Sequence, residues 1–248
     1  MSPQAQILLY GASNLWLSRR AALDGLVRRF VGPLEIGLAN GPGRSYGLRA
    51  GNPVARYLPL SEVAFPFDSS APVRVAFVTD IGNDVAYGQP PERILRWVRR
   101  LLDRLENEGY RVIVGGAPVQ SLRLINTYLF SALARLYYPQ GTLSLEKVAS
   151  DLEQVDQGVF DLCRERTFTY LEVNPRWYSW DRFHLKLSAR QSYWDTLLRD
   201  FPVLGPNPVR PIPHRRFLPP ERYWLFNKER TGLGRYLDPL GQSTVWVK

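Results

Sequence analysis

Apolar residues along the chain fall into short continuous runs and longer stretches with helical spacing. Five runs have the length and composition of buried strands: Gln6–Tyr10, Leu34–Asn40, Val73–Thr79, Tyr110–Pro118 and Thr167–Val173. Between and after them, apolar residues recur every three or four positions, which predicts helices. The predicted helical segments are Leu15–Phe30, Pro91–Gly109, Ser121–Tyr137, Ser144–Arg164 and Leu187–Phe201.

The alternation of strands and helices predicts a parallel sheet between two layers of helices. Val73–Thr79 is apolar almost throughout, which is typical of a strand covered on both faces. The pattern ends near Phe201, and frequent prolines then disfavour regular structure. We therefore expect an α/β domain of residues 1–201 and a Pro-rich C-terminal extension of residues 202–248. Aromatic residues such as Trp224 and Trp246 indicate an extended strap that packs on the domain.

Charge and cysteine content narrow the possible partners. The chain has 248 residues and a net charge of +9, and from Phe201 onward eight basic residues stand against three acidic ones. The arginines there are scattered, so a solvated surface explains them better than a specific nucleic-acid site. Cys163 is the only cysteine and there are two histidines, which argues against a disulfide or a common zinc centre. No signal peptide or membrane-spanning run is visible, so we expect a cytoplasmic protein without a membrane span.

Chemically capable residues follow the predicted strands. In parallel α/β sheets, reactive groups gather at the carboxyl ends of the strands. The segments found there are GASN (residues 11–14), NGPGRS (40–45), DIGND (80–84) and DRFH (181–184). Together they supply a hydroxyl, glycine amides, a side-chain amide and an Asp–His pair.

This combination is what acyl transfer requires. A serine hydroxyl becomes nucleophilic when a base removes its proton, and histidine suits that role near neutral pH. A carboxylate orients the imidazole, and N–H donors stabilise the oxyanion of the tetrahedral intermediate. Glycine lets a backbone N–H approach that oxyanion closely because it has no Cβ.

Each residue also has a simpler interpretation. Ser13 could only cap a helix, because serine is a favoured N-cap residue. Asn83 and Asp84 could be turn residues, and His184 could be a hydrogen-bonded histidine without a catalytic role. Because the four segments occur in order, each at the end of a strand, the combination favours catalysis.

The four segments resemble the sequence blocks of the SGNH hydrolases, the GDSL esterase and lipase superfamily. GASN resembles the first block, NGPGRSYG the second, IGND the third and DRFHL the last. The resemblance implies a flavodoxin-like three-layer α/β/α sandwich with a five-stranded parallel sheet. It implies Ser13 as nucleophile, His184 as base and Asp181 as its orienting partner. Ser13, Gly43 and Asn83 would donate to the oxyanion.

The chain departs from the family pattern at three places. Ala12 stands where the family usually has Asp, which puts the local hydrogen bonding before the serine in doubt. Arg182 stands where the family often has Gly. The second block matches loosely, so Gly41 or Gly47 could replace Gly43 as the oxyanion donor.

The expected reaction is hydrolysis of a carboxylic ester, with a short acyl or O-acetyl group, through an acyl-enzyme and without a cofactor or metal. The substrate would be a small molecule, such as a sugar or lipid ester. An acyltransferase and a non-catalytic binding protein with this fold remain alternatives. We expect the substrate to be contacted by residues that flank the catalytic set: Asn14, Arg44, Asp84, Arg182 and Phe183.

Overall fold

The computed structural model describes residues 3–30, 33–50, 55–67, 71–137 and 143–201. Beyond these it describes the backbone of four strands in the C-terminal extension. Residues 202–221, where the predicted strap is richest in proline, lie outside the described residues.

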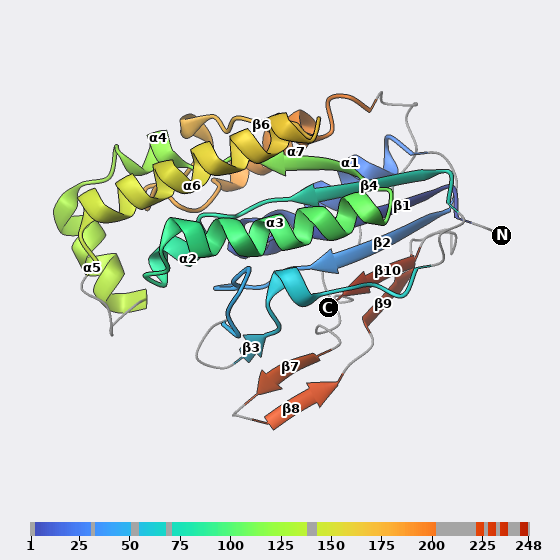
Figure 1. Cartoon of the computed structure of the whole chain (residues 1–248), viewed down its shortest axis with the longest axis horizontal. Helices are drawn as coiled ribbons and strands as arrows, with labels where there is room; N and C mark the ends of the chain where they lie inside the picture. Colours follow the sequence, from blue (N-terminus) through green and yellow to red (C-terminus); the bar gives the residue numbers. More distant parts are fainter. Residues whose placement is uncertain are drawn as a thin grey trace.

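A parallel sheet forms the centre of the molecule (Figure 1). Its five strands lie side by side in the order β6-β5-β4-β1-β2, all parallel. Their bounds are β1 Ala5–Tyr10, β2 Leu34–Ala39, β4 Val73–Val78, β5 Arg111–Gly115 and β6 Thr169–Leu171. The predicted five-stranded parallel sheet is therefore confirmed.

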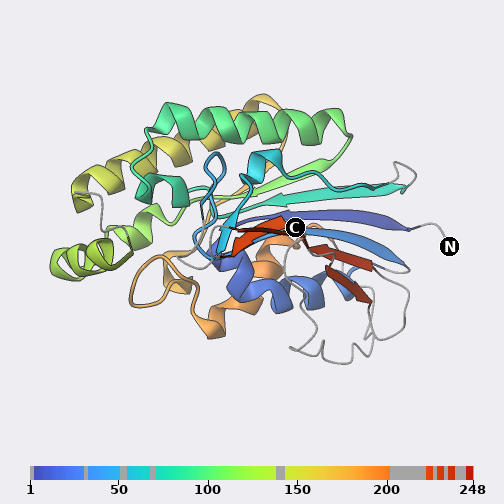
Figure 2. The same ribbon diagram turned by 90° about the horizontal axis from the view of Figure 1, so that it is seen from below.

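Helices cover both faces of the sheet, and Figure 2 shows the three layers edge-on. Helices α3 (Pro91–Asn107) and α6 (Leu145–Glu165) pack together on one face. Helices α1 (Ser13–Val27) and α7 (Arg190–Leu197) pack together on the other. Helix α5 (Thr127–Tyr137) lies beyond the carboxyl ends of the strands in both views. This is the three-layer α/β/α sandwich that the sequence predicts.

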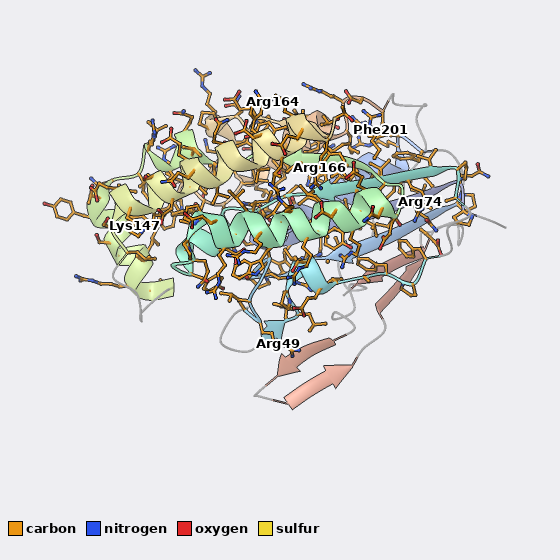
Figure 3. All side chains as sticks on the ribbon, in the orientation of Figure 1. Arg49, Arg74, Lys147, Arg164, Arg166 and Phe201 are labelled. Carbon is orange, nitrogen blue, oxygen red and sulfur yellow. The ribbon has the colours of Figure 1, made fainter. Side chains whose placement is uncertain are left out.

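The alternation of side chains along β1 explains the two layers of core. Leu8 and Tyr10 belong to the apolar cluster beneath α3 and α6, whereas Ile7 and Leu9 belong to the cluster beneath α1 and α7. All four are almost completely buried, as expected for a central strand. On the outer side of α6, Lys147 and Arg164 extend into solvent (Figure 3).

Several boundaries differ from the sequence pattern. The predicted helix Ser121–Tyr137 is divided into α4 (Val119–Leu122) and α5, and the last helix begins with a 3₁₀ turn, Leu187–Ala189. Strand β6 is shorter than predicted because Thr167 has a positive φ of 57°, which interrupts an extended strand. Further short elements are β3 (Ala55–Tyr57), α2 (Asn83–Ala86) and the 3₁₀ turns Leu60–Glu62 and Pro175–Trp177.

The C-terminal extension contributes strands that the sequence pattern does not predict. Strand β10 (Thr244–Val247) pairs in parallel with β2, and β9 (Gly234–Leu237) pairs antiparallel with β10. They extend the sheet to seven strands. Strands β7 (Arg222–Leu225) and β8 (Lys228–Thr231) form a second sheet with β3. The division into residues 1–201 and 202–248 stays a prediction. Among the described residues, no helix combines the length and apolarity needed to cross a bilayer.

Candidate active site

A cavity of about 310 Å³ lies where the loops that follow strands β1, β2, β4 and β6 meet. Ser13 and His184, which are far apart in the sequence, both line it. The structure records no hydrogen bond between these two described residues, and catalytic hydrogen bonds are often long before substrate binds. The other predicted residues that line the cavity are Asn14, Gly43, Asn83, Asp181 and Phe183.

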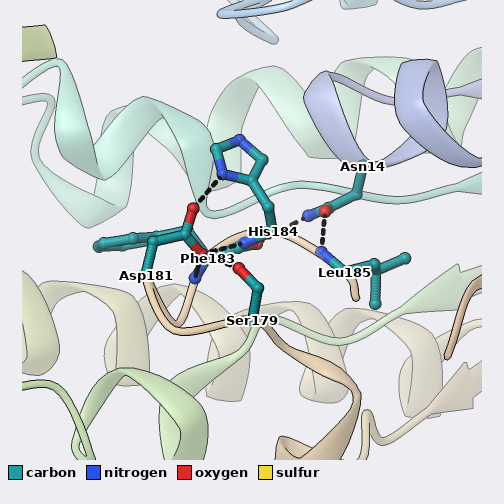
Figure 4. A network of polar contacts seen from close by, with 6 residues as sticks. All are labelled: Asn14, Ser179, Asp181, Phe183, His184 and Leu185. Carbon is teal, nitrogen blue, oxygen red and sulfur yellow. Dashed lines mark hydrogen bonds and ion pairs between the residues drawn. The ribbon is translucent and has the colours of Figure 1, made fainter. Parts of the chain in front are cut away.

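His184 and Asp181 are joined by a short polar contact (Figure 4). The distance from His184 Nδ1 to Asp181 Oδ2 is 2.6 Å. The other carboxylate oxygen, Oδ1, accepts hydrogen bonds from the Ser179 hydroxyl (2.7 Å) and from the backbone N–H groups of Phe183 (3.1 Å) and His184 (3.0 Å). Burial alone would raise the pKa of Asp181, but these bonds hold that pKa well below its usual range.

The ionised state of Asp181 decides the tautomer of His184. A carboxylate only accepts hydrogen bonds, so the proton between the two groups sits on His184 Nδ1. The other ring nitrogen, Nε2, is then free to accept a proton. The imidazole side chain is 35% exposed, which leaves it accessible from the cavity.

Asn14, in the segment GASN, binds the backbone on both sides of His184, in the segment DRFH, as Figure 4 shows. Its Nδ2 donates to the carbonyl of Phe183 at 3.0 Å, and its Oδ1 accepts from the N–H of Leu185 at 2.8 Å. These two backbone groups flank His184. Asn14 was expected to bind substrate, but both ends of its amide are engaged in fixing the histidine loop beside Ser13.

We expect Asn14→Ala to lower kcat more than it changes KM. The two backbone groups beside His184 lose their partners, and a displacement of about 1 Å in a reacting group costs roughly 100-fold in rate. Steady-state kinetics on an ester substrate measure this split. Asn174→Ala is the matched control, because Asn174 only accepts from Arg176 N–H in an exposed turn. An unchanged kcat in Asn14→Ala would show that the loop is held without this amide.

Asp80 supplies a carboxylate to the N-terminus of α1. Ser13 is the first residue of α1 and Ala12 is its N-cap residue, so the interpretation of Ser13 as the N-cap is wrong. Asp80 Oδ2, at the end of β4, accepts from the N–H groups of Ala12 (2.7 Å) and Leu15 (3.0 Å). A carboxylate at a helix N-terminus is favourable because it satisfies free N–H donors.

The sequence analysis assigned no role to Asp80 and missed this one. Asp80 has a positive φ of 62°, a conformation that Asp tolerates better than most residues. Burial raises the pKa of its carboxyl, and the hydrogen bonds from Leu15 and Ala12 partly offset this. The only signal in the sequence was the missing acid at position 12 together with an acid at the end of a neighbouring strand.

The predicted oxyanion donors approach the cavity from β2 and β4. Asn83 Nδ2 donates to the carbonyl of Arg44 at 3.0 Å, which orients the amide and leaves its second N–H for another acceptor. Gly43 has a positive φ of 68°, as its small size allows. Of the three candidate glycines, Gly43 lines the cavity, whereas Gly41 and Gly47 pack against the rings of Tyr57 and Trp97.

Arg44 and Asp84 were expected to contact substrate, and the structure contradicts this because both are buried away from the cavity. Arg44 is 1% exposed and donates to the carbonyls of Asn40 (3.1 Å) and Leu58 (3.2 Å). Asp84 accepts from the Ser45 hydroxyl and from Tyr46 N–H. Both side chains therefore fix the loop after β2.

The remaining predicted contact residues lie on the histidine loop. Phe183 lines the cavity, with its ring centroid 6.4 Å from that of Phe130 on α5. Arg182 is not among the cavity-lining residues. It occupies a turn closed by its N–H to Ser179 O at 3.0 Å, with a positive φ of 65°. That conformation accounts for the frequent glycine at this position in the family pattern.

The buried carboxyl of Asp84 predicts a pH-dependent stability. Burial raises its pKa to about 6, despite the hydrogen bonds from Ser45 and Tyr46. Because the folded-state pKa exceeds that of the unfolded chain, the Asp84 contribution to the free energy of unfolding decreases as pH rises from about 4 to about 6. Asp84→Asn lacks this titration, so its stability relative to wild type should rise by roughly 2–3 kcal/mol across that window.

Urea unfolding of wild type and Asp84→Asn at about pH 4.5 and about pH 7.5 measures this difference. Asp161→Asn, on the solvent side of α6 beside Arg164, is the control. A pH-independent difference between wild type and Asp84→Asn would contradict the prediction.

Comparison with known proteins adds the fold. The sequence matches no protein-family model and no curated protein. Solved structures do match: a proposed arylesterase from Agrobacterium tumefaciens has 15% identity and a TM-score of 0.51 over 80% of this chain and 100% of that chain. The inhibitor-bound aryl esterase of M. smegmatis has 11% identity and a TM-score of 0.50 over 80% and 100%. A proposed acylhydrolase from Bacteroides fragilis has 10% identity and a TM-score of 0.51 over 81% and 89%.

The chain has the three-layer α/β/α fold of these structures. At 10–15% identity the likeness establishes the fold alone. Within this fold, the structure brings one set of predicted residues to a single cavity: Ser13, Gly43, Asn83, Asp181 and His184. In the described parts of the chain, no three His, Cys, Asp or Glu side chains are grouped to hold a metal ion.

Proposed function

We propose that the protein is a serine hydrolase that cleaves carboxylic esters through an acyl-enzyme on Ser13. The observation that carries the proposal is the shared cavity of Ser13 and the His184–Asp181 pair, with Asn14 tying the loop of His184 to the start of α1. The fold, shared with esterase and acylhydrolase structures, supports the same reaction class.

In the first step, Ser13 Oγ attacks the ester carbonyl while its proton passes to His184 Nε2. Asp181 accepts a hydrogen bond from the Nδ1–H of the resulting imidazolium and stabilises its positive charge. The carbonyl oxygen becomes an oxyanion that accepts from Ser13 N–H, Gly43 N–H and Asn83 Nδ2. The C–O bond to the alcohol then breaks, and His184 returns the proton to the departing oxygen.

In the second step, water attacks the acyl-enzyme. His184 removes a proton from that water, and the same donors hold the second oxyanion. The bond between the acyl carbon and Ser13 Oγ then breaks, His184 returns its proton to Oγ, and the carboxylic acid is released. An alcohol in place of water would make the product a new ester. The ratio of acid to transferred ester, measured with and without added alcohol, separates a hydrolase from an acyltransferase.

The direct test is hydrolysis of a panel of p-nitrophenyl esters by the purified full chain. We expect release of p-nitrophenol above the rate of an Asp181→Asn, His184→Ala double variant at the same concentration. Equal rates for the wild type and the double variant across the panel would overturn the proposal.

A further inference from the structure

One half of the cavity is unlike the catalytic half. It is walled by side chains from α5, from α6 and from Leu143, two residues before α6: Phe130, Leu133, Ala134, Leu143, Val148 and Leu152. None of these side chains carries a polar atom. Phe130, Ala134, Val148 and Leu152 are at most 9% exposed, and Leu133 and Leu143 are partly buried. We name these six residues the α5–α6 wall.

The α5–α6 wall reaches the catalytic half at Gly82. A Cβ at that position would come within 2.4 Å of Leu152 Cδ1, so the absence of a side chain lets Leu152 lie directly over the backbone. The next residue is Asn83, the proposed oxyanion donor. A group attached to the reacting carbonyl therefore meets apolar surface at once.

The six side chains of the α5–α6 wall offer a polar ligand no hydrogen-bond partner. Among the lining residues of the described chain, the charged carboxyls are those of Asp80 and Asp181, and both are engaged in the hydrogen bonds described above. No described lysine or arginine lines the cavity. A sugar hydroxyl placed against the α5–α6 wall would lose its hydrogen bonds to water without replacement, which is unfavourable.

We propose that the α5–α6 wall binds the acyl group of the substrate, and that this group is an unbranched alkyl chain longer than acetyl. The inference rests on the proposed function, since it assigns the acyl side of the same ester. Apolar pockets with a few convergent polar groups are typical of small-molecule sites, and about 300 Å³ lies at the small end of their range. An acetyl group would leave most of this volume empty.

The acyl side of the ester fits the wall better than the alcohol side does. His184 protonates the departing alcohol, and its side chain keeps 35% exposure, which gives that alcohol a path to solvent. The acyl group must remain bound until water releases it. The apolar half of the cavity, with four of its six side chains buried, suits a group that is retained between the two steps.

The test varies the acyl chain while the alcohol stays p-nitrophenol. For wild type we expect kcat/KM to rise about fourfold for each methylene added beyond acetate, until the chain outgrows the cavity. In Ala134→Phe the ring fills the wall, so the ratio of kcat/KM for hexanoate to kcat/KM for acetate should fall toward one. Ala132→Phe is the matched control, because Ala132 is exposed two positions away on the same helix.

Comparison within each variant separates pocket filling from damage to the fold. A loss of folded protein lowers the rates for all esters alike, whereas a filled pocket changes the profile with chain length. Val148→Ala enlarges the same wall and should move the best substrate to a longer chain. Acetate as the best wild-type substrate, or an identical chain-length profile in Ala134→Phe, would overturn the inference and leave the proposed esterase function standing.

A binding experiment without turnover tests the acyl-binding wall independently of the proposed esterase function. Calorimetric titration with sodium hexanoate and sodium acetate should give tighter binding of hexanoate to wild type, weakened in Ala134→Phe. That result without hydrolysis of any ester would support the apolar pocket and contradict the proposed function. Equal affinity for hexanoate and acetate would contradict the apolar pocket.

The alcohol side of the ester is tested by varying the alcohol of acetate esters. If kcat/KM changes with the alcohol but not with the acyl chain, and Ala134→Phe abolishes that change, the wall binds the alcohol and the inference is wrong.

Discussion

Replacing Ser13 by alanine is expected to reduce kcat for ester hydrolysis by about 10⁴-fold or more, with little loss of stability. The hydroxyl supplies the atom that bonds to the acyl carbon, and no other described serine lines the cavity. Alanine is a good helix former, so α1 should begin at the same place. The carboxylate of Asp80 still receives the N–H groups of Ala12 and Leu15.

Steady-state kinetics and urea unfolding on Ser13→Ala measure the two parts of this prediction. Ser150→Ala, an exposed serine on α6, is the matched control and should behave as wild type. If Ser13→Ala retained more than about a tenth of the wild-type rate, the nucleophile would have to be another group.

Asp181→Asn is the second change with a large expected effect. An amide in place of the carboxylate can offer an N–H to His184 Nδ1, which moves the ring proton to Nε2 and removes the base. The expected loss in kcat is roughly 10³–10⁴-fold, with a smaller change in KM. Asp161→Asn, whose exposed carboxylate pairs with Arg164 on α6, is the control.

The stability of Asp181→Asn should change with pH in a defined direction. The pKa of Asp181 is lower in the folded protein than its ordinary value, so its charge stabilises the fold above the unfolded-state pKa of about 3.9. That stabilisation is lost as pH falls toward the folded-state pKa. We therefore expect Asp181→Asn to lower the free energy of unfolding by about 1–3 kcal/mol near neutral pH and by less near about pH 3. A loss that is the same at both pH values would contradict the depressed pKa.

The sequence predicted the parts of the molecule that depend on local pattern. The continuous apolar runs identify β1, β2, β4 and β5, and the single apolar stripe of α3 identifies that helix. The rule that loops meet at the carboxyl ends of parallel strands then brings Ser13 and His184 to one cavity. These inferences need only spacing along the chain and the geometry of a sheet.

What the sequence did not predict depends on contacts between distant segments. The hydrogen bonds of Asn14 and Asp80 join residues separated by 65 to 171 positions. Arg44 lies near the cavity in sequence order, yet its side chain turns inward to backbone carbonyls. A charge is expected at the surface by default, and no spacing rule predicts such an inward turn.

The C-terminal extension illustrates the same limit. Its frequent prolines predicted little regular structure. Strands β10 and β7 nevertheless pair with β2 and β3, and this pairing depends on a free sheet edge that the local sequence does not reveal. The sequence also could not predict the α5–α6 wall. Its side chains line the cavity because α5 packs beyond the ends of the strands, which is a tertiary arrangement.

The most direct measurement of the central claim is reaction of the full chain with a serine-directed fluorophosphonate, followed by peptide mass mapping. The geometry predicts one adduct, on Ser13, whose formation is abolished in His184→Ala because the base no longer removes the serine proton. An adduct on a different serine, or unchanged labelling of Ser13 in His184→Ala, would contradict the assignment of this cavity as a Ser13–His184 active site.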